Sequence, residues 1–146
     1  MITSVSEVRK IKEIVEEIKE ELTAEQLPFV DVEQGIMIET PAAVLLSGEL
    51  AREADFISLG TNDLTQYTLA ADRVNVETAA YYDPLHPSVM KLIEITVNNA
   101  LKEGVKVSVC GESAADASCA KAYAALGVRC LSMAQNAMIP VKQHLL

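Results

Sequence analysis

The sequence predicts an α/β protein built on a parallel sheet. Four short apolar runs of strand length occur along the chain, and each is followed by a polar turn and then by helix-forming residues. Neighbouring parallel strands need a crossover connection, which a helix supplies. Because the runs are almost entirely apolar, we expect strands covered on both faces, as in a barrel or a doubly wound sheet. The 146 residues suit one domain.

The first predicted element is an amphipathic helix. Apolar residues recur three or four positions apart over residues 5–22, with Lys and Glu between them, which places one apolar stripe on a helix. Ser4 and Glu7 have the spacing of a capping box, which predicts that the helix begins there. A polar stretch over residues 23–34, broken by Pro28, separates this helix from the first apolar run.

The first strand-and-helix unit begins at Gly35. Residues 35–38 are predicted to form a buried strand that ends at the carboxylate of Glu39. Thr40 is a suitable N-cap and Pro41 is favoured at the first helical position, so we expect one helix over residues 42–54.

The second unit repeats this order. Residues 55–59 are strand-like, residues 60–63 are predicted to form a polar loop, and a short helix is expected over residues 64–71. After a polar excursion over residues 73–84, a long amphipathic helix is predicted over residues 86–104.

Two more strands complete the pattern. Residues 105–110 form the third predicted strand, and a helix is expected from Gly111 to Gly127. Residues 128–133 form the fourth predicted strand, before a short last helix that contains Pro140.

Composition excludes several kinds of ligand. The chain has 12 Lys and Arg against 21 Asp and Glu, a net charge of −9, so nucleic acid is excluded as its main ligand and anionic membranes are disfavoured. No apolar run approaches the roughly 18 residues of a membrane helix, and no signal peptide is recognised, so a soluble cytoplasmic protein is expected. Cys110, Cys119 and Cys130 match neither a redox pair nor a zinc site and are predicted to be free thiols.

Polar residues that directly follow the predicted strands are the candidates for chemistry, because ligands bind at the carboxyl ends of parallel strands. These residues are Glu39, Asn62, Asp63, Cys110 and Glu112. Carboxylates brought to one rim are suitable oxygen ligands for magnesium, together with substrate phosphate oxygens and waters. The alternative for each carboxylate taken singly is a helix N-cap or a partner of the helix dipole.

Cys110 has two interpretations. A thiol at the start of a helix lies near free backbone amides and can serve as an acid or a base. From spacing alone, a small buried hydrophobic role is favoured for Cys110, and Cys119 and Cys130 are assigned to the core.

The segment from Gly60 to Gln66 suits an anion such as phosphate, because a glycine precedes backbone amides at a helix start. Arg73 is a candidate for a bidentate phosphate contact, and the alternative is a solvated ion pair with Asp72. His86 is predicted to cap a helix, and His144 indicates no function, so a histidine-based metal cluster is not expected.

These motifs resemble one known family. Together they look like the C-terminal region of Enzyme I of the bacterial sugar phosphotransferase system, the phosphoenolpyruvate-protein phosphotransferases. Pyruvate phosphate dikinase and phosphoenolpyruvate synthase share similar motifs, but the Glu-Thr-Pro-Ala-Ala run and Tyr67 are closer to Enzyme I. The likeness covers nearly the whole chain and rests on residues 35–43 (GIMIETPAA), 58–70 (SLGTNDLTQYTLA), 72–73 (DR), 86–89 (HPSV) and 110–112 (CGE).

The resemblance implies a role for each candidate residue. Glu39 and Asp63 would bind magnesium, and Asn62 and Arg73 would hold the phosphate of phosphoenolpyruvate. Cys110 would donate the proton to the enolpyruvate carbon as pyruvate forms, which reverses the assignment of Cys110 to the core. In the family the phosphoryl group passes to a histidine on a separate N-terminal domain and then to the carrier protein HPr.

The resemblance also implies a fold for residues 1–146, namely the last four strands of a TIM-type (β/α)8 barrel. The N-terminal phosphohistidine and HPr-binding domains and the arginines of the first half-barrel would then be absent, so the chain is expected to be inactive alone. A half-barrel has two open sheet edges, which predicts a homo-oligomer. Ala115 departs from the family pattern, which has glycine there.

Two other functions share these motifs. One is a non-catalytic module, either one that binds phosphoenolpyruvate or a structural half-barrel whose site residues are idle. The other is the C-terminal part of a dikinase or a synthase. Two tests distinguish the catalytic function from the non-catalytic ones. The first is whether phosphoenolpyruvate binds, and the second is whether its phosphate moves to an added acceptor domain.

Overall fold

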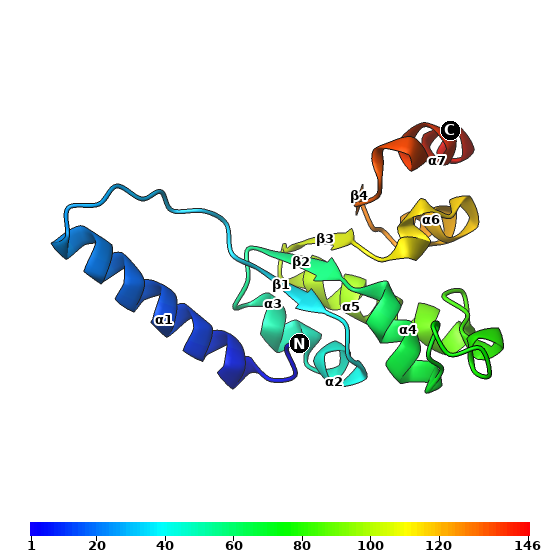
Figure 1. The fold of residues 1–146 in the computed structure, drawn as a ribbon, viewed down its shortest axis with the longest axis horizontal. Coiled ribbons are helices and arrows are strands. Elements are labelled where there is room, and N and C mark those ends of the chain that lie inside the picture. The colour runs from blue at the N-terminus through cyan, green and yellow to red at the C-terminus, as the bar shows by residue number, and fades with distance from the viewer.

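The computed structural model describes residues 1–146 as an α/β protein with one parallel sheet of four strands in the order β1-β2-β3-β4 (Figure 1). The predicted parallel α/β class is therefore confirmed, and each strand pairs with the strand that follows it in the chain. The strands are β1 (Gly35–Ile38), β2 (Phe56–Leu59), β3 (Lys106–Val109) and β4 (Cys130–Leu131).

Helices occupy all the connections and both ends of the chain. No helix is both long enough and apolar enough to cross a membrane. The α-helices are α1 (Val5–Ala24), α2 (Pro41–Leu45), α3 (Ser47–Ala51), α4 (Thr61–Leu69), α5 (Pro87–Lys102), α6 (Ala117–Ala125) and α7 (Gln135–Leu145), and the 3₁₀ helices are η1 (Ala79–Tyr81) and η2 (Glu112–Ala115).

The core lies on one face of the sheet. Strand side chains at alternate positions are buried together with the apolar stripe of α5. On the other face Met37 and Cys130 are exposed, and Ser58 and Ser108 between them are half-buried. The expected covering of the strands on both faces, as in a barrel or a doubly wound sheet, is thus found on only one face within residues 1–146, where alternate side chains are enclosed as the two-residue repeat of a strand dictates. The buried strand residues are Ile38, Ile57, Leu59, Val107 and Val109.

The helix predicted over residues 42–54 is divided into α2 and α3 at Leu46. The predicted cap is confirmed, because Thr40 Oγ1 accepts a hydrogen bond from the Ala43 amide at 3.1 Å. Leu46 then leaves helical geometry, with φ −100° and ψ 12°, directly before Ser47 and Gly48. Serine and glycine have low helix propensity, which explains a break at this point.

The predicted loop over residues 60–63 is also wrong, because α4 begins at Thr61. Gly60 occupies the N-cap position, so Asn62 and Asp63 lie in the first helical turn. A carboxylate in the first turn interacts favourably with the helix dipole, which explains why the polar residues are helical here.

The helix predicted from Gly111 to Gly127 is two elements, η2 and α6, with Asp116 as the N-cap of α6. The Asp116 carboxylate accepts hydrogen bonds from the Ser118 and Cys119 amides at 2.9 Å each. The pKa of the Asp116 carboxyl is therefore lowered. An aspartate in an extended conformation is a strong helix-starting residue, and its position fixes where α6 begins.

All three cysteines are free, as predicted, but they differ in burial. Cys119 is buried, and its burial raises the pKa of the thiol to about 11. Cys130 is exposed, which contradicts its assignment to the core. Its partner in the register is Ser108, on the uncovered face of the sheet.

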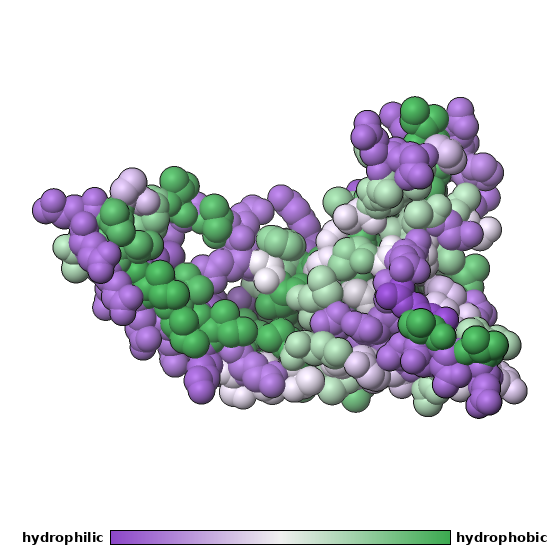
Figure 2. All heavy atoms as spheres, viewed as in Figure 1, coloured by the Kyte–Doolittle hydropathy of each residue, from purple (hydrophilic) through white to green (hydrophobic).

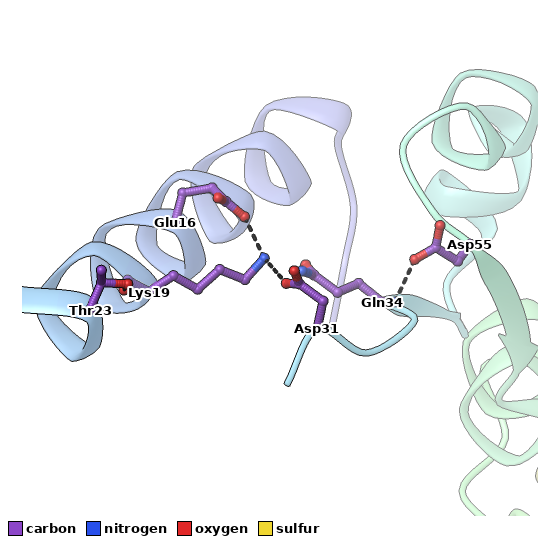
Figure 3. A network of polar contacts seen from close by, with 6 residues as sticks. All are labelled: Glu16, Lys19, Thr23, Asp31, Gln34 and Asp55. Atoms are coloured by element: carbon purple, nitrogen blue, oxygen red, sulfur yellow. Dashed lines mark hydrogen bonds and ion pairs between the residues drawn. The ribbon is translucent and has the colours of Figure 1, made fainter. Parts of the chain in front are cut away.

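Helix α1 is joined to the sheet by the segment 25–34. The capping box is confirmed, because the Ser4 amide donates to Glu7 Oε2 at 2.8 Å. Figure 3 shows how the segment is held: Lys19 Nζ contacts Asp31 Oδ1 at 2.6 Å, and the Gln34 amide donates to Asp55 Oδ2 at 2.7 Å. The segment that leads from α1 into β1 is therefore tied to Lys19 of α1 and to Asp55, which directly precedes β2.

Candidate functional site

The candidate site lies at the carboxyl ends of the strands. The Gly60 amide donates to the Ile38 carbonyl at 3.0 Å, and the Cys110 amide donates to the Leu59 carbonyl at 3.0 Å. Ile38, Leu59 and Val109 are paired in the register, so the residues that follow them form one row. That row is Glu39, Gly60 and Cys110, and the predicted candidates Asn62, Asp63 and Glu112 follow it in α4 and η2.

Two carboxylates meet at the start of this row. Burial raises the pKa of Glu39, and the nearby charge of Asp63 raises it further. Glu39 follows β1 and Asp63 comes from the first turn of α4, which begins after β2. Ionisation of both carboxyl groups is unfavourable at this proximity because their negative charges repel, and a cation bound between them would relieve the repulsion.

The donor set fits magnesium. This cation is usually held by one or two carboxylates and completes its shell with waters and substrate phosphate oxygens. A Cβ at Gly60 would lie 2.9 Å from Glu39 Oε2 and 2.8 Å from Glu39 Cβ, so the glycine leaves the space in which this carboxylate sits. Glu39 and Asp63 supply two carboxylates, and the chain has no group of three or more acidic, histidine or cysteine side chains placed to hold a metal ion.

Asn62 links the beginning of α4 to the turn after β3. Its side-chain Oδ1 accepts a hydrogen bond from the Glu112 amide at 3.0 Å. Its backbone carbonyl accepts a hydrogen bond from the Tyr82 hydroxyl at 3.3 Å. The Asn62 side-chain oxygen is thus used within the protein, and its side-chain amide hydrogens remain as donors for an anion.

Arg73 reaches the site through Glu112. Arg73 Nη1 lies 2.6 Å from Glu112 Oε1, and the two side chains are 38% and 79% exposed. The ion pair with Asp72 that was considered as an alternative is not formed: Arg73 pairs with Glu112, and Asp72 Oδ1 accepts a hydrogen bond from the Val74 amide. An exposed ion pair of this kind is weak, so an anionic ligand can compete for the guanidinium group.

Tyr82 is a site residue that sequence reasoning missed. Burial raises the pKa of its hydroxyl, and the charges of Arg73, Glu112 and Asp63 all act on it. Tyr82 therefore lies near Arg73, Glu112 and Asp63, which belong to separate segments of the sequence. Tyr82 belongs to the polar excursion over residues 73–84, whose sequence has no periodic pattern that would predict a contact with the site.

Cys110 is half-buried at the end of β3. Its Sγ lies 3.5 Å from the Leu59 carbonyl oxygen, as a thiol donor to that oxygen. The expected long helix after Cys110 does not begin there, because η2 intervenes before α6. The thiol therefore lies beside a strand end and a single 3₁₀ turn. Ala115 is exposed in that turn.

Comparison with known proteins shows the family of the chain. A family described as "PEP-utilising enzyme, PEP-binding domain" matches residues 1–146. The chain belongs to the PEP-utilising enzyme family.

Individual relatives match almost the whole chain. A multiphosphoryl transfer protein of Xanthomonas campestris is 50% identical over 145 residues, which are 99% of this chain and 17% of that protein. The phosphoenolpyruvate-protein phosphotransferases of Lactococcus lactis and Bacillus subtilis are 41% and 38% identical, over 97% and 99% of this chain. The match covers 25% and 26% of these two proteins. The chain therefore spans about a quarter or less of the length of these relatives.

Proposed function

We propose that this chain is the phosphoenolpyruvate- and magnesium-binding part of a phosphoenolpyruvate-protein phosphotransferase. The phosphoryl group of phosphoenolpyruvate would pass to an enzyme histidine outside this chain and then to HPr, in sugar uptake in the cytoplasm. The observation that carries the proposal is the meeting of Glu39 and Asp63 beside Gly60, where the pair needs a cation. The names of the relatives support the substrate and the reaction.

Each candidate side chain has a proposed role. Magnesium bound by Glu39 and Asp63 would neutralise charge on the transferring phosphoryl group. Arg73 would exchange its contact with Glu112 for a bidentate contact with the phosphate. The Asn62 side-chain amide would donate to the same phosphate, which aligns the group for transfer.

Cys110 would complete the reaction. When the bond between phosphorus and the enol oxygen breaks, the enolate of pyruvate remains and its C3 takes up a proton. A thiol in the same row as Glu39 would donate that proton, and the thiolate would be reprotonated from solvent. Cys110 is therefore the proposed general acid.

Residues 1–146 would form the C-terminal half of a TIM-type barrel. The uncovered sheet face carries Met37, Ser58, Ser108 and Cys130, small or flexible side chains such as a barrel interior accommodates. Consecutive parallel strand order with the core on one face supports the same assignment. The phosphohistidine and HPr-binding parts would lie outside these residues.

Isothermal titration calorimetry tests the proposed binding. We expect phosphoenolpyruvate to bind the chain only with magnesium present, and Asp63→Asn to abolish the heat of binding. Glu20→Gln is the control, because Glu20 is an exposed carboxylate on α1. Binding that is equal in Asp63→Asn and the unmodified chain would refute the assignment of Asp63, and no binding by the unmodified chain would refute the proposed function.

A further inference from the structure

A buried chain of hydroxyl groups lies behind the candidate site. The Tyr123 hydroxyl, on α6, donates to Ser113 Oγ at 2.9 Å, and Ser113 Oγ lies 2.7 Å from Thr61 Oγ1. Tyr123 and Thr61 are 0% exposed and Ser113 is 8% exposed. Because Ser113 accepts from Tyr123, its own hydrogen is free to be donated to Thr61. One hydrogen-bonded chain thus joins α6, η2 and α4.

This chain does little for stability as such. A buried hydroxyl pair contributes only about 0.5–1.5 kcal/mol net, and apolar groups of the same shape can replace it at almost no cost. What directional bonds add is a fixed geometry in a low-dielectric interior. The hydroxyls therefore specify how the three elements sit against one another.

The elements that they join carry the site residues. Thr61 directly precedes Asn62 and Asp63, and Ser113 lies three residues after Cys110. A Cβ at Gly111 would overlap the Thr61 hydroxyl and would lie 3.1 Å from Asn62 Oδ1. The turn after β3 and the first turn of α4 are therefore in direct contact, with no room for a larger side chain at Gly111. The position of the thiol relative to the carboxylate of Asp63 depends on this contact.

We propose that Tyr123, Ser113 and Thr61 are positioning residues that hold the turn of Cys110 against the first turn of α4. What that position serves rests on the proposed function, in which Cys110 donates a proton beside Asp63. None of the three side chains touches the substrate in this account. They act through Cys110, Asn62 and Asp63.

The rate of Cys110 alkylation by iodoacetamide tests this proposal in the full chain without any ligand. Mass spectrometry of the peptides reports Cys110 and Cys130 separately, and the exposed Cys130 is the internal reference. Thr61→Val and Tyr123→Phe each remove one hydroxyl and keep the side-chain shape. We expect each to speed alkylation of Cys110 relative to Cys130 by about two- to tenfold, the change that loss of one hydrogen bond allows.

Two further variants separate positioning from simple stability. Thr61→Ser restores the hydroxyl and is expected to return the Cys110 to Cys130 ratio to its original value. Thr96→Val removes a buried hydroxyl of α5 that bonds only to the Leu92 carbonyl of its own helix, and it is expected to leave the ratio unchanged. An unchanged ratio in both Thr61→Val and Tyr123→Phe, with folding verified by circular dichroism, would overturn the proposal. Tyr123→Phe alone decides if Thr61→Val does not fold.

Protection by ligand distinguishes this proposal from the proposed function. If magnesium and phosphoenolpyruvate protect Cys110 but the hydroxyl variants leave its rate unchanged, the site is real and the positioning role is wrong. If the variants change the rate and the ligand gives no protection, the positioning role is supported and the proposed function is wrong.

Discussion

Glu39 shows at the scale of one residue how a binding site opposes folding. Burial and the neighbouring Asp63 raise its pKa above 4.5, so the folded chain favours the protonated form more than the unfolded chain does. Stability is therefore lost as the pH rises from about 4.5 through the raised pKa. At neutral pH the ionised Glu39 is a cost to the fold, which the proposed bound cation would offset.

Glu39→Gln should reverse this cost. We predict that the substitution raises the unfolding temperature at neutral pH by about 1–3 °C and that the gain disappears at acidic pH. The same variant should lose magnesium-dependent binding of phosphoenolpyruvate. Thermal unfolding followed by circular dichroism across a pH series measures the first effect, with Glu20→Gln as the control. A gain that is constant at every pH would contradict the proposed origin of the strain.

Single residues also show what sequence could predict of the site. Glu39, Asp63 and Cys110 were predicted because they follow apolar runs directly, and strand ends come together in any parallel sheet. Tyr82 and the Arg73–Glu112 ion pair were not predicted, because their contacts depend on how an irregular segment folds over α4. A contact of that kind has no periodicity that a sequence can display.

At the scale of elements, the start of α4 and the turn after β3 depend on one glycine. Gly111 leaves room for the Thr61 hydroxyl, and the Asn62 side chain bonds to the amide next to it. The sequence predicted the strands and the long helices α1 and α5, whose periodic patterns are unambiguous. It misplaced the starts of α4 and α6 because capping by Gly60 and Asp116 decides them locally.

Gly111→Ala should therefore separate these two elements. We predict that it lowers the free energy of unfolding by about 1–3 kcal/mol, since an extra methyl group in a packed contact forces a backbone shift. Gly48→Ala in α3 is the matched control, because its Cβ would meet only Asn99 at 3.9 Å. That control should raise the free energy of unfolding by about 0.5–1 kcal/mol through helix propensity.

Urea unfolding measures both glycine variants. Equal effects of Gly111→Ala and Gly48→Ala would show that the turn after β3 is not packed against α4. A loss confined to Gly111→Ala would support the contact on which the candidate site depends.

At the scale of the whole molecule, helix α1 and the segment 25–34 expose a large apolar surface. Figure 2 shows an apolar band along α1 that faces the segment 25–34. Ile11, Ile14 and Ile18 are each about half exposed, and Val30 and Val32 on the segment are 82% and 73% exposed. Contiguous exposed apolar surface of this kind marks an interaction site.

Self-association is the expected consequence. We predict that the average molar mass from light scattering exceeds the monomer mass of 15.8 kDa and falls on dilution. The double variant Ile14→Gln with Ile18→Gln should shift the chain toward the monomer, because it removes apolar area from the band. Glu13→Gln with Glu17→Gln, on the polar side of α1, is the matched control. A monomer at all concentrations would contradict this expectation.

The central claim is that one cation joins Glu39 and Asp63 when phosphoenolpyruvate is bound, and paramagnetic broadening of amide signals tests it most directly. Manganese replaces magnesium in such oxygen-ligand sites and broadens the NMR signals of nearby amides. With phosphoenolpyruvate present, we predict that the amides of Glu39, Asn62, Asp63 and Gly111 broaden first, and that Asp63→Asn prevents this. Broadening at the acidic residues of α1 instead, or broadening that Asp63→Asn leaves unchanged, would contradict the account.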